Sequence, residues 1–216
     1  MHNQPWTTAP LVAVDLEGTG SQDRETEAIL EVGVVPLDAG RPLMAGSYHS
    51  LVNPERHVPR RSWISASFSD DVLASAPPLD VVTPELVTRL DGAYIVGHNV
   101  LVDWRLLSLR CPGVRPAALI DTLKLTRLVH RGTRRHSLTA LLAHYQLTDE
   151  VTQLAGGGEP HRALWDAVGA ALLLGTLIAE LPSDGPVSVS KLREVAGQPI
   201  GGGATEDAPG QIPLLF

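Results

Sequence analysis

The chain has 216 residues, of which 44% are hydrophobic, and this is enough apolar sequence for one globular domain with a sizeable core. Its formal net charge of −7 argues against a general polyanion-binding protein, because such proteins are usually basic. The single cysteine excludes an internal disulfide, and residues 1–10 lack the features of a secretory signal. No apolar stretch is long enough to span a bilayer. We therefore expect a cytoplasmic protein without a membrane partner.

The first part of the chain predicts three strands. Apolar residues indicate strands over 11–14 and 28–35, with Pro36 ending the second, and a third strand is expected over 44–52. Short connections between these strands favour antiparallel pairing. A loop-rich region over 54–78 follows.

Helices and short strands alternate further along the chain. We expect helices over 83–90, 101–109, 122–129, 137–145 and 162–181, and short buried strands over 93–96 and 117–120. Thr83 and Ser137 are the expected N-caps of two of these helices. This order predicts an α/β fold in which helices flank a mixed central sheet.

A change in composition marks the end of the predicted domain. Residues 1–181 form the expected domain, whereas residues 182–216 begin with a stretch rich in proline, glycine, serine and alanine. That composition predicts a flexible tail, with at most weak local order near residues 187–195.

Four acidic residues stand beside short apolar segments. Asp15 and Glu17 end the first strand two positions apart, so both lie on the same side of it. Asp103 lies near the start of a helix, and Asp166 is the only acid within 162–179. A lone acid near a helix start is more often a cap or a partner of the helix dipole. An acid pair two positions apart is by itself often a chance occurrence. Buried acids repel each other, and hard divalent cations take carboxylate oxygens, so four converging acids indicate a metal site.

Three motifs resemble, in the same order, those of the DEDDh 3′→5′ exonucleases. They are Asp-Leu-Glu-Gly-Thr-Gly at 15–20, His98-Asn99 with Asp103, and His-Arg-Ala-Leu-Trp-Asp-Ala at 161–167. The motifs look like those of the proofreading (epsilon) subunit of bacterial DNA polymerase III and its relatives, and the resemblance covers about residues 10–180. The resemblance implies a ribonuclease-H-like fold and phosphodiester hydrolysis with two Mg²⁺ (or Mn²⁺) ions ~4 Å apart.

The resemblance also implies a role for each acid. Asp15 would bridge both ions, Glu17 and Asp166 would complete the site on the nucleophile side, and Asp103 would hold the second ion directly or through water. His161 would be the general base, since the unperturbed imidazole pKa of ~6.5 lies near working pH. His161 and Asp166 would not share a helix face, so we expect His161 on the loop before the helix. The residues expected to border the substrate are Gly18, Thr19, His98 and Asn99.

The chain departs from the family on the substrate side. Many relatives carry Thr where this chain has Gly18, and Phe where it has Val102, while residues 65–69 (Ser-Ala-Ser-Phe-Ser) replace a His-Gly-Ile loop. The basic run 124–136 is a candidate phosphate contact, or else a solvated helix end. A second candidate surface, in which aromatic residues would stack on bases or else belong to the core, comprises Arg56, Arg60, Arg61, Trp63 and Phe68.

The last six residues resemble the sliding-clamp-binding motif of bacterial replication and repair proteins. Gln211, Leu214 and Phe216 would be its anchors, and the alternatives are a segment that folds back on the domain or a chance match of a short motif. The leading hypothesis is a metal-dependent 3′→5′ exonuclease acting on DNA in proofreading or repair, alone or with a polymerase subunit. An RNA-directed exoribonuclease of the same superfamily is the alternative. The intact acids argue against a non-catalytic binding module.

Overall fold

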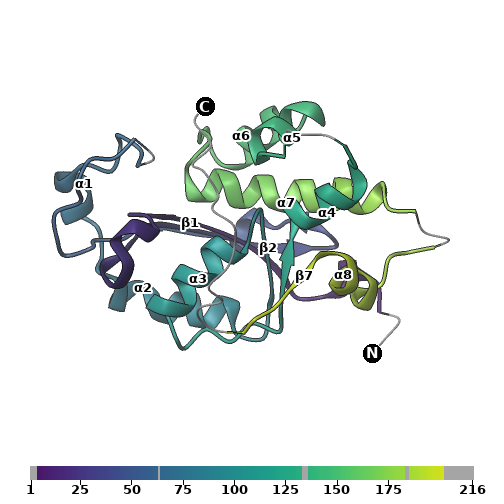
Figure 1. Ribbon diagram of the computed structural model, residues 1–216, viewed down its shortest axis with the longest axis horizontal. Coiled ribbons are helices and arrows are strands. Elements are labelled where there is room, and N and C mark those ends of the chain that lie inside the picture. Colours follow the sequence, from purple (N-terminus) through teal and green to yellow (C-terminus); the bar gives the residue numbers. More distant parts are fainter. Residues whose placement is uncertain (1–3, 63, 133–135, 183–184, 202–216) are drawn as a thin grey trace.

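The described part of the chain forms a mixed sheet with helices on both faces (Figure 1). A computed structural model describes residues 4–62, 64–132, 136–182 and 185–201. The seven-stranded sheet has the order β3-β2-β1-β5-β6-β7, and β4 also pairs with β2. Its strands are β1 (Leu11–Gly18), β2 (Ile29–Asp38), β3 (Arg41–Pro42), β4 (Tyr48–Leu51), β5 (Tyr94–Gly97), β6 (Ala118–Asp121) and β7 (Gly197–Gln198). The predicted α/β class is therefore confirmed.

Eight α-helices surround the sheet within the described ranges. They are α1 (Asp70–Ala74), α2 (Leu79–Leu90), α3 (Leu101–Arg110), α4 (Thr122–Val129), α5 (Leu138–His144), α6 (Thr148–Leu154), α7 (Ala163–Ala179) and α8 (Val189–Ala196). Short 3₁₀ turns form at Trp6–Thr8, Ser21–Thr26 and Met44–Gly46. Among the described residues, no helix is both long and apolar enough to cross a membrane.

Strand β1 lies in the middle of the sheet and separates two hydrophobic cores. It pairs antiparallel with β2 and parallel with β5. Leu11 and Ala13 face the core that contains α7, whereas Val12 and Val14 face the core that contains α2 and α3. Because side chains alternate along a strand, Asp15 is expected on the α7 side.

Two prolines that we expected near the boundaries of secondary-structure elements, Pro36 and Pro84, lie inside them. Strand β2 runs through Pro36 to Asp38, where the prediction ended at residue 35. The carbonyl of Pro36 accepts the Leu43 N–H, on the side of β2 away from β1. The missing N–H of Pro36 therefore breaks no bond to β1.

Helix α2 begins at Leu79, so the prediction of a start at Thr83 is wrong. Thr83 donates its hydroxyl to the Leu79 carbonyl instead of capping the helix, and Pro84 lies in the helix interior. Val82, Leu86 and Leu90 are buried on one face of α2. Burial of this apolar face outweighs the cost of one proline.

The predicted strand over 44–52 is shorter than expected, because residues 44–46 form a 3₁₀ turn and β4 begins at Tyr48.

Residues 185–201 also differ from the expected tail. Helix α8 buries Leu192 and Ala196 in the α7-side core, and β7 pairs antiparallel with β6. The structured part of the chain therefore continues beyond residue 181. Some residues with predicted roles lie outside the described ranges, namely Trp63, Arg134, Arg135, Gln211, Leu214 and Phe216.

Candidate metal-binding active site

The structure brings three of the four predicted acids together between β1 and α7. Asp15 and Glu17 come from β1, and Asp166 comes from the first turn of α7. One carboxylate oxygen from each residue lies within 4.8 Å of the other two. A set of three close oxygen donors matches the ligand preference of Mg²⁺ and Mn²⁺.

Gly33 allows α7 to reach this position. It lies opposite Asp15 in the β1–β2 ladder. A Cβ atom at residue 33 would lie 2.3 Å from both the carbonyl carbon and the carbonyl oxygen of Ala163. Only glycine therefore lets the first turn of α7 rest directly on β2, and this contact places Asp166 beside Asp15.

Asp103 reaches the site from the first turn of α3 and is 8% exposed. Its Oδ1 atom accepts the backbone N–H of Leu16 at 2.9 Å, so the carboxylate is bound to β1 between the other two acids. It lies outside the group of three close ligand oxygens, but its charge raises the pKa of Asp15. This position is compatible with a second ion site next to the first.

The acids are electrostatically unfavourable without a cation. Burial, followed by repulsion from Asp103, Asp166 and Glu17, raises the pKa of Asp15 well above its usual value. Burial and the charge of Asp166 raise the pKa of Glu17 to about 8. Burial is also the main cause of the raised pKa values of Asp103 and Asp166. A bound divalent cation would offset this repulsion.

His161 lies on the turn immediately before α7, as expected, and is exposed. Its backbone is left-handed, with a φ angle of +64°, which costs roughly 1–3 kcal/mol for a residue with a side chain. The His161 N–H donates to Asp166 Oδ2 at 3.1 Å. The same acid that belongs to the oxygen cluster therefore also holds the turn that carries His161.

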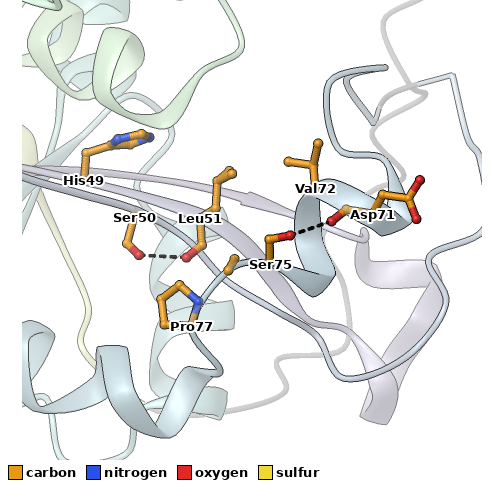
Figure 2. Close-up of a pocket in the computed structure, with 8 residues that line it drawn as sticks. His49, Ser50, Leu51, Asp71, Val72, Ser75 and Pro77 are labelled. Atoms are coloured by element: carbon orange, nitrogen blue, oxygen red, sulfur yellow. Dashed lines mark hydrogen bonds between the residues drawn. The ribbon is translucent and has the colours of Figure 1, made fainter.

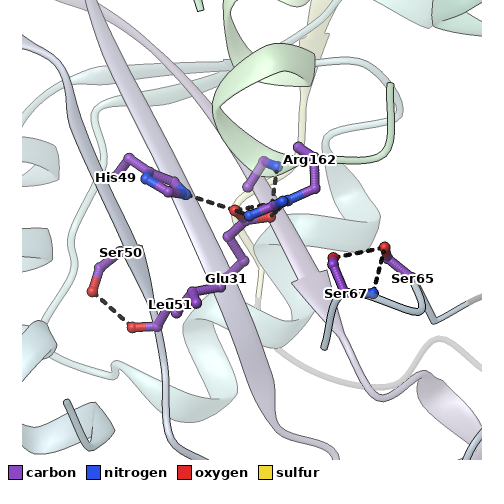
Figure 3. Close-up of polar contacts among 8 residues, drawn as sticks. Glu31, His49, Ser50, Leu51, Ser65, Ser67 and Arg162 are labelled. Carbon is purple, nitrogen blue, oxygen red and sulfur yellow. Dashed lines mark hydrogen bonds and ion pairs between the residues drawn. The ribbon is translucent and has the colours of Figure 1, made fainter. Parts of the chain in front are cut away.

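A buried polar network beside this turn has a centre that sequence analysis did not assign to the site (Figure 3). The Glu31 side chain in β2 is fully buried and accepts hydrogen bonds from Arg162, from the Ala163 N–H and from His49. Burial alone would raise the pKa of Glu31, but these hydrogen bonds lower it to about 2. An acid inside the apolar run 29–35 was the available signal, because a buried carboxylate needs partners.

His98 and Asn99 are held tightly at the ends of β5 and β6. The His98 ring contacts the Thr122 hydroxyl at 3.0 Å and donates from Nε2 to the His136 carbonyl at 2.6 Å. Burial is the main cause of its lowered pKa. Asn99, with a φ angle of +67°, donates its N–H to Asp121. Both residues therefore shape the backbone that leads into α3.

Gly18 and Thr19 have close packing partners. A Cβ atom at residue 18 would lie 2.8 Å from Leu106 Cδ2, so the glycine matches the space left by α3. Thr19 is fully buried, and its hydroxyl accepts the Ala28 N–H. Their contribution next to a substrate would therefore come from the backbone, because neither presents an exposed side chain.

The connection between β1 and β2 is bound to α3 by an ion pair that sequence analysis also missed. Arg105 donates to both carboxylate oxygens of Glu27, at 2.5 and 2.7 Å. Glu27 is 2% exposed, and its backbone carbonyl accepts a hydrogen bond from Arg110. This pair fixes the segment that follows the motif of Asp15 and Glu17.

The structure shows which residues of the two candidate substrate surfaces are engaged in contacts within the protein. Phe68 is buried in a small hydrophobic cluster, which matches the core alternative and not base stacking. Arg56 donates to the Thr26 carbonyl at 2.6 Å, and Lys124 donates to the Gly197 carbonyl at 2.7 Å. Arg127 is exposed on α4 and close enough to lower the pKa of His98. The tryptophans next to the acids, Trp104 and Trp165, are core residues.

A cavity of about 590 Å³ lies between β4 and α1 (Figure 2). Its lining residues are His49, Ser50, Leu51, Asp71, Val72, Ser75, Ala76 and Pro77. The lining includes none of the four acids predicted for the site, and His49 is its link to the Glu31 network. The cavity is therefore adjacent to the acidic site and not part of it.

Comparison with known protein families matches most of the chain. The family model RNase_T, described as an exonuclease, matches residues 12–174. The chain is 26% identical over 174 residues to the 3′-5′ exonuclease DinG of Bacillus subtilis, covering 79% of this chain and 18% of that protein. It is 31% identical to a PolC-type DNA polymerase III of Thermotoga petrophila, covering 77% of this chain and 12% of that protein. It thus spans less than a fifth of either relative.

A shorter relative and a solved structure match more of their own length. The chain is 25% identical to the DNA polymerase III subunit epsilon of Rickettsia conorii, covering 67% of this chain and 66% of that subunit. Exonuclease X, solved in complex with 5′ overhanging duplex DNA, is 26% identical with a TM-score of 0.63, covering 78% of this chain and 91% of that one. The nuclease domain of 3′hExo, bound to rAMP, has a TM-score of 0.60 at 16% identity and supports the fold alone.

Proposed function

This chain belongs to the RNase_T exonuclease family, and from that premise we propose that it removes nucleotides from the 3′ ends of DNA by metal-dependent hydrolysis. The observation that carries the proposal is the group of three carboxylate oxygens from Asp15, Glu17 and Asp166 within 4.8 Å of one another. Family membership alone would not require intact chemistry, whereas this cluster retains a ligand set for a divalent cation.

The acids would hold two Mg²⁺ (or Mn²⁺) ions. Asp15, Glu17 and Asp166 would hold one ion, and Asp103 with Asp15 would hold the other. When bound, such ions lower the pKa of a water molecule and stabilise the leaving 3′ oxygen. The raised pKa values of these acids support the assignment, because a cation would relieve the repulsion that causes part of the shift.

His161 is the proposed general base. Its position on an exposed turn leaves the ring accessible to a water molecule at the cluster, and its N–H bond to Asp166 ties the turn to the acids. The imidazole would take one proton from the attacking water and pass it to solvent. Replacement of His161 by Ala should therefore preserve cation binding and remove most of the activity.

DNA is favoured over RNA by the relatives. The names of the similar proteins include DNA polymerase III subunits, and the exonuclease X structure contains duplex DNA. Arg127 on α4 and the backbone at Gly18 and Thr19 would border the strand, with His98 and Asn99 supporting that backbone. A DNA substrate is consistent with the cytoplasmic location expected from the sequence.

A single assay tests the reaction and the substrate. The full chain is incubated with single-stranded DNA or RNA labelled at the 5′ end, in Mg²⁺, in Mn²⁺ or in EDTA. Stepwise shortening of DNA that requires the cation, and that is lost in Asp15→Asn, is the expected result. No cation-dependent shortening of either polymer would refute the enzyme, and faster shortening of RNA would favour the exoribonuclease.

We also propose that the C-terminal hexapeptide binds a bacterial sliding clamp, and that a polymerase subunit is a further candidate partner. The support is the sequence Gln-Ile-Pro-Leu-Leu-Phe at 211–216, together with the replication proteins among the relatives. Tethering would raise the local enzyme concentration at DNA. Deletion of 211–216 should abolish clamp binding in calorimetry and leave cleavage of short oligonucleotides intact. Unchanged clamp affinity after the deletion would exclude this partner.

A further inference from the structure

We propose that Arg162 is a positioning residue that acts through His161, and that the buried Glu31 carboxylate is the anchor that gives Arg162 this role. The proposal rests on the proposed function of His161 as general base. It assigns a task to the polar network shown in Figure 3, which contains none of the clustered acids.

The anchor binds two consecutive residues of the chain. Arg162 Nε lies 3.1 and 3.0 Å from the two carboxylate oxygens of Glu31, and its Nη2 donates to Oε1 at 2.6 Å. The N–H of Ala163 donates to Oε2 at 3.0 Å. A fork of this kind fixes direction as well as distance, so it ties the backbone directly after His161 to β2.

His161 is consequently held from both sides. Its own N–H is bound by Asp166, and the following residue is bound by Glu31. Its left-handed backbone, with a φ angle of +64°, persists only if the surroundings impose it. Without the Arg162 fork, the turn would relax toward commoner backbone angles and the imidazole would move away from the acids.

Other contacts restrict the guanidinium further. It lies over the Phe68 ring, 5.5 Å from the ring centroid, and the arginine side chain is 28% exposed. His49 occupies the opposite side of the Glu31 carboxylate, with Nε2 at 2.6 Å from Oε1. Since its Nε and Nη2 groups donate to Glu31, we assign Arg162 the contacts of a support and not those of a phosphate ligand.

A double-mutant cycle tests this assignment. Single-turnover rates on single-stranded DNA are measured for the wild type, Arg162→Ala, His161→Ala and the double variant. We expect Arg162→Ala to lower the rate about 10- to 100-fold with an unchanged half-saturating enzyme concentration, because small misplacements of a catalytic group have effects of this size. In the His161→Ala background, Arg162→Ala should change the rate less than about twofold.

Folding and cation binding are followed in parallel. The increase in Tm on adding Mn²⁺ should be the same in Arg162→Ala as in the wild type, which shows a folded protein with an intact oxygen cluster. Glu31→Gln removes the anchor charge and should reproduce the Arg162→Ala rate, while Arg162→Lys should restore only part of it. Arg105→Ala is the matched control, because Arg105 makes a comparable fork with the buried Glu27 away from His161. It should lower Tm, and His161→Ala should lower the rate in the Arg105→Ala background as much as it does in the wild type.

The outcomes separate this proposal from the proposed function. If the losses in activation free energy of the two single variants add in the double variant, Arg162 acts independently of His161. That result overturns the positioning role and leaves the base role standing. Full activity of His161→Ala would overturn the base role and the positioning role together. Loss of the Mn²⁺ response in both Arg162→Ala and Glu31→Gln would show that the network supports the acids and not His161, which also overturns the proposal.

Discussion

Replacing Gly33 by Ala tests whether the contact between α7 and β2 assembles the site. The added Cβ would lie 2.3 Å from the Ala163 carbonyl group, where ordinary contacts are 3.4–4 Å. The first turn of α7 or strand β2 must therefore move by about 1 Å. Overpacking of this kind costs ~1–3 kcal/mol of the free energy of unfolding, or about 2–4 °C in Tm for each kcal/mol at this chain length.

The functional effect of Gly33→Ala should exceed its effect on stability. Moving Asp166 and His161 by about 1 Å should lower the hydrolysis rate ~100-fold and weaken Mn²⁺ binding. Thermal melts with and without Mn²⁺, together with single-turnover cleavage, measure both effects. Gly185→Ala is the control, because nothing lies within 4 Å of a Cβ there. A Gly33→Ala protein that cleaves DNA and binds Mn²⁺ like the wild type would refute the link between this contact and the site.

Three further predictions concern charge and pH. Glu17 has a pKa raised from 4.5 to about 8, so the native state holds a proton that the unfolded chain releases, and stability in EDTA should fall as pH rises from about 4.5 to 8. Excess Mg²⁺ should flatten that trend in thermal melts, and a flat EDTA profile would contradict the shift. Glu31 has a pKa lowered to about 2, so it should contribute about 3 kcal/mol at neutral pH, lost as pH falls from 4.5 to 2. Acid unfolding of Glu31→Gln should lack this component, and an unchanged acid limb would disprove it. Arg105→Ala leaves the Glu27 carboxylate buried without its cation and should cost ~3 kcal/mol in urea unfolding. Glu27→Gln in the same chain should recover part of this loss, and no recovery would point to lost packing instead.

Local sequence signals were sufficient for the elements that carry the acids. The apolar run before Asp15 predicts β1, and period-2 alternation predicts that Asp15 and Glu17 share a side. The helix beginning near residue 101 and the Ser137 cap were also predicted correctly, because these signals involve neighbours within one or two turns. By contrast, the start of α2 was wrong, since burial against the sheet outweighs the local preference of Pro84.

Sequence patterns therefore predicted which acids lie near one another, which strand and helices carry them, and that His161 precedes a helix. The contacts that hold these groups in place follow from tertiary packing. Glu31 and Arg162 are far apart in the chain, and their pairing depends on Gly33 admitting α7 onto β2. The docking of α8 and β7 on the sheet is equally non-local. Contacts of this kind are selected by the packing of the whole domain, so no short stretch of sequence encodes them.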